Sequence, residues 1–522
     1  MGEAGSTTAG ELIAEGLRRR QTSGLAAALD CFQRAAQLEP ESHLPHFMLG
    51  NAASELGDLD AAVTHFERAR MLRPYNHVVR FNLGLTQLSR GYIEAALEHL
   101  LAACELEPSY LPAQSCYILA LHSSDRVGPE QIAARIREWG GAFSSIHPEG
   151  ARAAWETEAS REMLRVGFVS GDFRLHSVAH FFEPIISARD TGAFWYVLYS
   201  TSLEQDSVTE RLRACADEWR DVARLPDPAL IDLIAKDRID ILVDLSGHTH
   251  GGRLAVFARR AAPVQITYVG FPNSTGLSSM DFRITDAATD PQGPADRWHS
   301  EALLRLPDAQ WCYRPSGPRP AEGPLPARAA GFVTFGSFNS LAKASDMLLR
   351  CWAQILMRLP ASRLRLTRVR SLQRGAEIVA LLGRLGVGAE RIDCLPHQSE
   401  VPQGWQYSGV DIALDHYPYN GVTTTCESLY CGVPVVSLHG RHGASRSGLS
   451  ILATLGLGEL AASTPEEYVD IAVSLASDLA RLEQLRASLG RRLDHSPLRD
   501  ERRFAAHFEQ ALRTAWRRRP QR

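Results

Sequence analysis

Three segments of this 522-residue chain carry side chains that suit anion binding or proton movement. In the first, 414–436, a predicted strand leads through an Asn-Gly turn into a predicted helix that begins with Thr423, Thr424 and Thr425. Threonine hydroxyls and free backbone N–H groups at a helix N-terminus favour the binding of a diphosphate. A plain threonine N-cap accounts for the same residues when this segment is considered alone.

Charged side chains in and near this segment add to the pattern. Glu427 lies one turn into the predicted helix, where a carboxylate can hold both hydroxyls of a ribose. The second segment, FGSFNSLAKAS (335–345), follows the end of a strand with Asn339, Ser340 and Lys343. Only two of the 56 basic residues are lysines, Lys236 and Lys343, so a lysine inside a motif is unusual in this chain.

The third segment, SGDFRLHSVAHF (170–181), places His176 and His180 four residues apart after a predicted strand. Histidine exchanges protons near neutral pH because its unperturbed pKa is about 6.5. A single histidine in this position is more often structural, and a pair at this spacing forms a metal site only with a further ligand. The residues alone leave these alternatives open.

Composition and missing motifs exclude several classes of protein. The 56 basic residues nearly balance the 60 acidic ones, which argues against nucleic-acid binding through a strong overall positive field. The chain has no helix-opening GxGxxG, which disfavours a dinucleotide-dependent oxidoreductase, and no GK[ST] after a glycine loop, which excludes the P-loop NTPases. It also has no GxSxG and no HExxH motif. Its single Asp-x-Asp, Asp58-Leu-Asp60, lies outside the α/β region, so that region lacks this common metal–diphosphate ligand pair, and with these motifs missing we expect no bound cofactor.

Whole-chain features predict a reduced, cytoplasmic protein without a membrane partner. No apolar run reaches the ~18 residues that a transmembrane helix needs. The N-terminus lacks the charged and then apolar layout of a secretory signal. The nine cysteines, without a CxxC pair, do not resemble a disulfide framework.

The first third of the chain repeats itself every 34 residues, as shown by Pro40, Pro74 and Pro108 and by Gly16, Gly50 and Gly84. This is the tetratricopeptide pattern, in which small residues let two helices approach and proline ends the second helix. It predicts a repeat arm over 1–143 with a degenerate last unit. Because each repeat contacts mainly its neighbours, we expect the arm to be separable and to offer a concave face to peptides or a partner subunit.

From Leu164 onward, short β-branched runs alternate with amphipathic stretches, which predicts α/β domains with parallel sheets. The predicted strands are 165–170, 195–200, 239–245, 264–271 and 282–286, and then 332–338, 362–369, 391–396, 410–415 and 434–439. We expect an N-terminal lobe over 144–310, a Pro-rich linker over 311–331 and a C-terminal lobe with closing helices over 332–522. Ligands of such sheets bind at the carboxyl ends of the strands.

The ordered set of motifs resembles the O-linked N-acetylglucosamine transferase family, which joins tetratricopeptide repeats to a two-lobed GT-B catalytic region. The motifs are RVGFVSGDFRLHSVAHF, DILVDLSGHTHGGR, APVQITYVGFPNSTGLSSMDFRITD, FGSFNSLAK, LDHYPYNGVTTTCESLYCGVPVV and HGASRSGLSIL. The likeness covers nearly the whole chain. It implies metal-independent, inverting transfer of GlcNAc from UDP-GlcNAc to Ser and Thr hydroxyls of proteins.

The resemblance also implies roles for single residues. His176 matches the active-site histidine, Lys343 matches the lysine on the diphosphate, and both are candidate catalytic residues. Pro272 lies in the loop that lines the sugar pocket, and Glu427 stands where the family has a ribose-binding aspartate. The candidate UDP-sugar contacts are Pro272, Ser340, Lys343, His397, Thr423, Thr424, Thr425 and Glu427.

Some positions depart from the family. Ser340 replaces a glutamine that contacts the nucleotide, Val422 replaces a histidine, and Glu400 and Gln403 stand where animal members have a lysine and a histidine. Fewer positive charges near the diphosphate leave the identity of the sugar open. The alternatives are a transferase that uses another nucleotide sugar or an Asn acceptor, and a tetratricopeptide scaffold with an inactive transferase region.

Overall fold

The structure is a computed structural model that describes residues 7–150, 162–321, 323–396 and 404–519. Its contacts divide the chain into two compact units. The first unit contains the chain up to Ser124 together with Ser340–Ala344 and Leu366–Ser399. The second contains Asp125–Asn339, Ser345–Arg365 and Glu400–Arg522.

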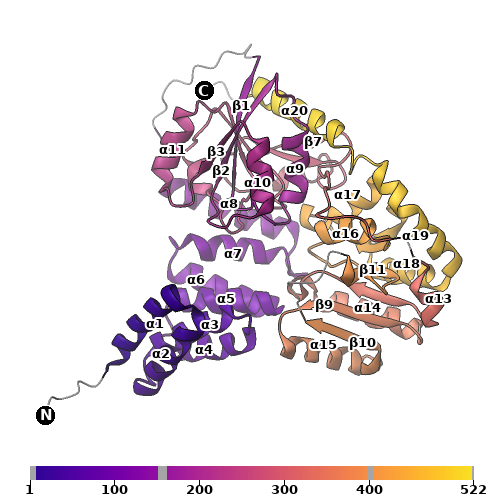
Figure 1. Ribbon diagram of the computed structural model, residues 1–522, viewed down its shortest axis with the longest axis horizontal. Coiled ribbons are helices and arrows are strands. Elements are labelled where there is room, and N and C mark those ends of the chain that lie inside the picture. Colours follow the sequence, from indigo (N-terminus) through magenta and orange to yellow (C-terminus); the bar gives the residue numbers. More distant parts are fainter. Residues whose placement is uncertain (1–6, 151–161, 322, 397–403, 520–522) are drawn as a thin grey trace. The chain divides into compact units, whose positions relative to one another are not determined.

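The first unit contains the predicted repeat arm as far as Ser124, and its helices follow one another in chain order (Figure 1). They are α1 (Ala9–Ser23), α2 (Leu25–Leu38), α3 (His43–Glu55), α4 (Leu59–Leu72), α5 (His77–Arg90), α6 (Ile93–Leu106) and α7 (Leu111–Leu121). The repeated glycines explain the 34-residue period, because each faces a large side chain of the next helix. A Cβ on Gly50 would lie 2.6 Å from the ring of Phe66, and Gly84 faces Leu100 in the same way.

The second unit begins with α8 (Pro129–Ile146), followed by a seven-stranded parallel sheet in the order β3-β2-β1-β4-β5-β6-β7. The strands are β1 (Leu164–Ser170), β2 (Phe194–Ser200), β3 (Glu218–Asp221), β4 (Ile241–Asp244), β5 (Val264–Thr267), β6 (Phe282–Asp286) and β7 (Ala302–Leu306). Between them run α9 (Ala179–Ser187), α10 (Ser207–Cys215), α11 (Asp227–Lys236) and α12 (Leu254–Ala258). Phe504 and Phe508 of the last helix, α20 (Glu501–Arg517), complete the core of this lobe.

A second sheet of six strands has the order β10-β9-β8-β11-β12-β13. The strands are β8 (Thr334–Ser337), β9 (Arg363–Val369), β10 (Ile392–Pro396), β11 (Ile412–Leu414), β12 (Val435–Leu438) and β13 (Ala461–Ala462). The helices are α13 (Pro326–Ala330), α14 (Asp346–Arg358), α15 (Leu372–Arg384), α16 (Thr423–Tyr430), α17 (Ser447–Thr454), α18 (Pro465–Ser477) and α19 (Leu479–Asp494). The predicted fold class, a repeat arm followed by two α/β lobes with parallel sheets, is confirmed.

The structure differs from the sequence-based expectation in its details. Three strands were not predicted: β3, a short and partly exposed edge strand rich in charge, β7, and the two-residue β13. The segment predicted as a linker begins with Trp311, Cys312 and Tyr313, which are all buried.

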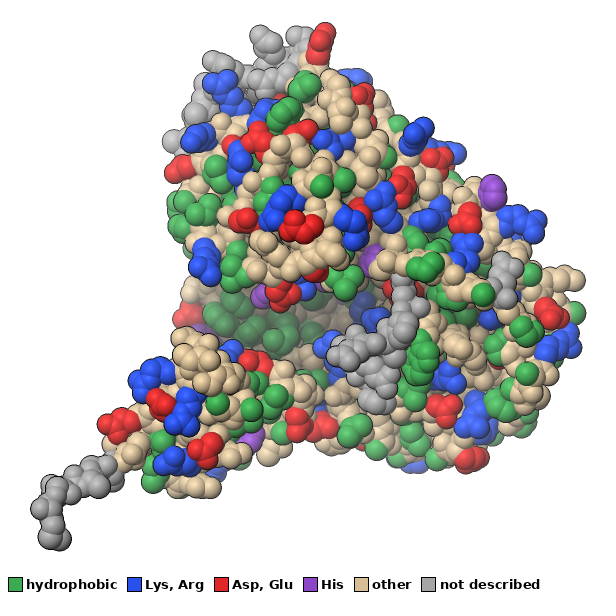
Figure 2. Space-filling model, in the orientation of Figure 1, with side chains coloured by type: hydrophobic (Ala, Val, Ile, Leu, Met, Phe, Trp, Pro, Cys, Tyr) green, Lys and Arg blue, Asp and Glu red, His purple; other side chains and the backbone are tan. Residues whose placement is uncertain are grey.

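Acidic and basic side chains intermix on the visible face of the first sheet's lobe (Figure 2). Within the described residues no helix is long and apolar enough to cross a membrane.

Candidate active site

The start of α16 is held by a buried carboxylate. Asp415, 3% exposed, directly follows β11. Its Oδ1 accepts the backbone N–H groups of His416 and Gly421, each at 2.8 Å, and the side-chain Nδ2 of Asn339 at 3.2 Å. Its Oδ2 accepts Ser437 Oγ at 2.8 Å. Asp415 therefore ties the turn before α16 to the strands on both sides of β11.

Two of the three predicted threonines are already engaged by this turn. Thr424 Oγ1 donates to Asn339 Oδ1 at 2.9 Å, and Thr425 Oγ1 donates to the Gly421 carbonyl at 3.0 Å. Thr423 is half-buried at the first helical position. The backbone N–H groups of this first turn have no acceptor inside the helix, which is where the sequence predicts an anion to bind; that site stays a prediction.

Glu427 lies one turn further along α16, as predicted. Tyr407 is buried and donates its hydroxyl to Glu427 Oε2 at 2.8 Å, while the Tyr407 ring packs on Phe338 at 4.3 Å between centroids. One carboxylate oxygen is therefore engaged by protein. The predicted role of Glu427 in holding a ribose stays a prediction.

The remaining predicted nucleotide contacts lie elsewhere in the chain. Ser340 and Lys343 belong to the first unit, where the Lys343 backbone N–H donates to the Ser340 carbonyl at 2.9 Å and closes a single 3-10 turn, η2 (Leu341–Lys343). Lys343 follows Asn339 by four residues. His397 lies outside the described residues, and so do Glu400 and Gln403.

His176 lies in the loop after β1, at the carboxyl end of the first sheet. Its Nδ1 faces two groups, accepting the Val178 N–H at 3.3 Å and lying 3.4 Å from Asp172 Oδ1. Burial lowers the pKa of His176, although the Asp172 carboxylate opposes this shift. Burial also raises the pKa of Asp172. Nδ1 can therefore accept the Val178 N–H in one tautomer or donate its hydrogen to Asp172 in the other.

His180, four residues further on, has a structural role. Its Nδ1 lies 2.8 Å from the Arg314 carbonyl, and the Arg314 backbone N–H donates to the His180 carbonyl at 2.8 Å. These bonds tie α9 to the segment after β7. The described residues hold no group of three or more His, Cys, Asp or Glu side chains arranged to bind a metal.

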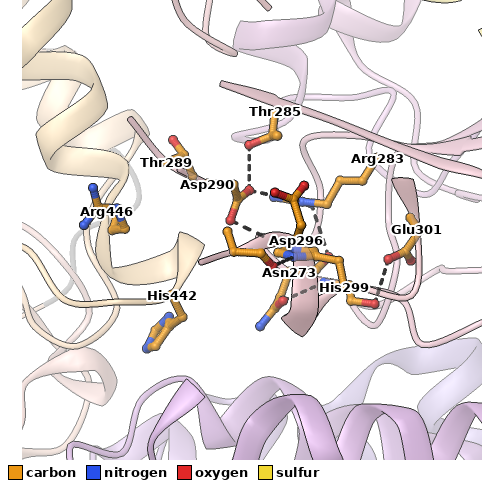
Figure 3. Close-up of polar contacts among 12 residues, drawn as sticks. Asn273, Arg283, Thr285, Thr289, Asp290, Asp296, His299, Glu301, His442 and Arg446 are labelled. Carbon is orange, nitrogen blue, oxygen red and sulfur yellow. Dashed lines mark hydrogen bonds and ion pairs between the residues drawn. The ribbon is translucent and has the colours of Figure 1, made fainter. Parts of the chain in front are cut away.

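The loop after β5 carries half-buried Pro272. Val269, at the start of this loop, has a φ of 59°, which is rare for a β-branched residue and marks stored strain. Two buried charged side chains, Arg283 and Glu301, form hydrogen bonds with this loop (Figure 3). Arg283 donates to the carbonyls of Phe271 and Asn273 at 3.0 and 3.2 Å.

The second of these charges is Glu301, which is 4% exposed. It accepts Ser274 Oγ and the Thr275 backbone N–H, both at 2.7 Å. On its other side the loop meets α8, because Gly140 leaves room for the carbonyl of Gly276. The backbone of the predicted sugar-pocket loop is thus fixed by hydrogen bonds on one side and close packing on the other.

The two α/β lobes touch within the second unit. Arg446 Nε donates to the Ala288 carbonyl at 2.8 Å, and Ser450 Oγ donates to Asp286 Oδ2 at 2.7 Å. In Figure 3, Arg446 and His442 lie across from Asp290 and Thr289 of the first lobe. The loops after β6 and β12 therefore form one polar contact between the lobes.

Sequence reasoning missed four of these buried charges: Asp172, Arg283, Glu301 and Asp415. Two of them left a signal, because Arg283 interrupts a predicted buried strand and Asp415 ends one. A charge at such a position must have a partner in the folded protein. Asp172 and Glu301 left none, since each lies in an irregular segment.

Comparisons with known proteins agree with this architecture. A model of glycosyl transferase family 41 matches residues 141–312 and 323–508, and a tetratricopeptide repeat model matches 45–76. The chain is 37% identical over 425 residues to the probable UDP-N-acetylglucosamine–peptide N-acetylglucosaminyltransferase SPINDLY of Petunia hybrida, covering 79% of this chain and 45% of that protein. It is 28% identical to the similarly named SEC of Arabidopsis thaliana, over 71% of this chain and 38% of that protein.

The chain thus spans about half the length, or less, of these curated relatives. Among solved structures, a lysine-to-methionine mutant of Thermobaculum terrenum O-GlcNAc transferase matches 99% of both chains. The TM-score of that match is 0.89, and the sequence identity is 35%.

Proposed function

Because this chain belongs to glycosyl transferase family 41, we propose that it is a protein glycosyltransferase that moves GlcNAc from UDP-GlcNAc to Ser and Thr hydroxyls. The observation that supports this proposal is the turn before α16, which Asp415 and Asn339 fix by hydrogen bonds at a helix N-terminus. The full-length match to an O-GlcNAc transferase structure supports the same reaction.

On the donor side, the reaction must stabilise the charge that develops on the departing diphosphate. The N–H groups at the start of α16 and the ammonium of Lys343 are the groups that we assign to this task. Preorganised donors of this kind act most strongly on charge that appears in the transition state. With these donors we propose transfer that needs no metal ion.

On the acceptor side, the acceptor oxygen forms a bond to the anomeric carbon as the bond from that carbon to the UDP oxygen breaks. Attack from the face opposite UDP inverts the configuration of the anomeric carbon. The hydroxyl proton passes to His176, for which we propose the role of general base. With Nδ1–H turned to Asp172, Nε2 is available to receive this proton.

Another tautomer gives His176 a different role. When Nδ1 accepts the Val178 N–H, as the distance of 3.3 Å allows, Nε2 carries the hydrogen and can orient the acceptor oxygen without taking its proton. The pH dependence of the rate separates the two roles. A base loses activity as the ring becomes protonated, whereas an orienting donor keeps its hydrogen.

A second candidate is transfer from a different nucleotide sugar. Val422 and Ser340, next to the predicted diphosphate and nucleotide contacts, carry neither a charge nor a long side chain. Such a donor site lacks contacts that the sequence resemblance leads us to expect for UDP-GlcNAc. An Asn acceptor and an inactive scaffold are the remaining alternatives.

The test is a donor panel of UDP-GlcNAc, UDP-GalNAc, UDP-glucose and GDP-linked sugars, each incubated with the protein and a cell extract. Mass spectrometry of the peptides then identifies the sugar and the modified side chain. We expect a GlcNAc adduct on Ser or Thr. A different adduct selects the second candidate, and no adduct with no thermal shift from UDP identifies an inactive scaffold.

A further inference from the structure

The repeat arm makes a polar contact with the second α/β lobe inside the first unit. Asp60, at the start of α4, lies at the N-terminus of α15, more than three hundred residues later in the chain. Its Oδ1 accepts Ser371 Oγ at 2.8 Å, and its Oδ2 accepts the Gln373 backbone N–H at 3.3 Å. Ser371 in turn caps α15 by accepting the Arg374 backbone N–H at 3.0 Å. A carboxylate from the arm therefore completes the cap of a lobe helix.

Arg90, the last residue of α5, closes the same contact. Its side chain is 6% exposed and donates from Nε to Asp60 at 2.7 Å and from Nη2 to Gln373 Oε1 at 2.9 Å. A buried guanidinium is costly without such partners. We call Asp60, Arg90, Ser371 and Gln373 the arm anchor.

Tyr92 extends the contact along α15. Its hydroxyl donates to Glu377 Oε2 at 2.6 Å, and burial together with this bond raises the pKa of Tyr92 to about 12. The guanidinium groups of Arg90 and Arg374 lie 4.6 and 5.0 Å from its ring centroid. These cation–π contacts add to the hydrogen bonds between the arm and the lobe.

The helix that ends in Arg90 has a second neighbour. Helix α5 also packs against η2, the turn that carries Lys343. One helix of the arm therefore touches both the cap of α15 and the lysine turn. Helix α5 still packs mainly against α4 and α6 of the arm, so its contacts with α15 and η2 add to those expected of a repeat, and the separability of the arm stays a prediction.

We propose that the repeat arm positions Lys343, with α5 as the supporting wall and the arm anchor as the joint that keeps α5 in place. The arm then contributes to the binding of the UDP-sugar donor as well as of the acceptor protein. Asp60 and Arg90 are positioning residues, because they act through α5 and not on the donor itself. This inference rests on the proposed role of Lys343 at the diphosphate. If the contact served packing alone, its loss would lower stability and leave UDP affinity unchanged.

The test compares full-length variants by calorimetric titration with UDP. Asp60→Ala removes the shared acceptor, and we expect it to weaken UDP binding roughly fivefold to twentyfold, the range seen for coupled residues. In a chain that already carries Lys343→Ala, adding Asp60→Ala should weaken UDP binding by less than about a further twofold, because a lysine that is absent cannot be mispositioned. The control is Arg68→Ala, which breaks the arm ion pair with Glu41 at 2.8 Å and should leave UDP affinity within about twofold.

Asp60→Ala leaves Arg90 buried without its carboxylate, so a milder variant is needed. Tyr92→Phe removes only the bond to Glu377 and should show a smaller loss of UDP affinity with the same dependence on Lys343. Hydrogen exchange should rise in 340–344 and 371–375 of either variant and stay unchanged there in Arg68→Ala.

Two results would overturn the inference: unchanged UDP affinity in both variants, or an equal loss with and without Lys343. UDP binding requires no turnover, so this test does not depend on sugar transfer. A protein that binds UDP in this pattern and yet modifies no acceptor would refute the proposed function and leave the inference standing.

Discussion

Replacing Asn339 by aspartate tests how the turn before α16 is built. Asn339 is 8% exposed, donates through Nδ2 to Asp415 at 3.2 Å and accepts the Thr424 hydroxyl through Oδ1. Asn339→Asp keeps the acceptor for Thr424 and turns the donor into a second carboxylate oxygen. Two charges at that separation repel by about 5 kcal/mol at an effective dielectric constant of about 20.

The protein can avoid this penalty only by keeping a proton on one of the two carboxyl groups, whose folded-state pKa then rises. In the unfolded chain both groups titrate near pH 4. Between these two pKa values the folded state holds more protons, so the stability of the variant falls as the pH rises. The deficit against wild type should therefore be small at pH 5 and largest at pH 8.

The assay is chemical denaturation at pH 5, 6.5 and 8, with Asn339→Ala as the matched control. The alanine variant loses two hydrogen bonds, which costs about 1–3 kcal/mol, and its deficit should not depend on pH. UDP affinity should fall in both variants because Thr424 and the turn lose their shared partner. A deficit of Asn339→Asp that is the same at all three pH values would refute the close pairing with Asp415.

Three further predictions concern catalysis and the arm. Lys343→Ala should lower the transfer rate by roughly 10²–10³, and Lys343→Arg should not restore it, because a guanidinium is broader than an ammonium; Lys236→Arg should be silent in the same assay. His176→Ala should lower kcat by roughly 10²–10⁴ at unchanged UDP affinity. The wild-type rate should stay level as the pH falls to below 6.5, because burial lowers the pKa of His176. A wild-type rate that is already halved at pH 6.5 would contradict the role of His176 as general base. Gly50→Ala should destabilise the arm by about 1–3 kcal/mol in thermal unfolding through its clash with the facing ring. Gly10→Ala, in α1 with no atom within 4 Å of the new methyl group, should cause no loss and stabilise the arm slightly, because alanine favours a helix more than glycine does.

The arm and the sheets could be predicted because their signals are local and periodic. Gly50 faces Phe66 at a fixed distance along the chain, so the same pair recurs in each repeat and the period is visible. The buried strands are continuous apolar runs. By contrast, β3 is a charged edge strand that forms because it pairs with β2, and no periodicity marks it.

The candidate site was predictable where one segment contains the whole feature. The Asn-Gly turn and the threonines at the start of α16 are such a case. The partners that hold this turn are not, because Asn339 reaches Asp415 and Thr424 from a different strand. The arm anchor is the extreme case, since Asp60 and Ser371 come together only through the fold of the first unit.

The most direct test of the proposed function is a transfer assay in EDTA with UDP-GlcNAc and a purified acceptor protein, with wild type and Lys343→Ala side by side. Peptide mass spectrometry locates and quantifies the sugar. We predict GlcNAc on a Ser or Thr side chain with wild type, and at least about 100-fold less with Lys343→Ala. Hydrolysis of UDP-GlcNAc without an adduct, or transfer that stops in EDTA, would contradict the account.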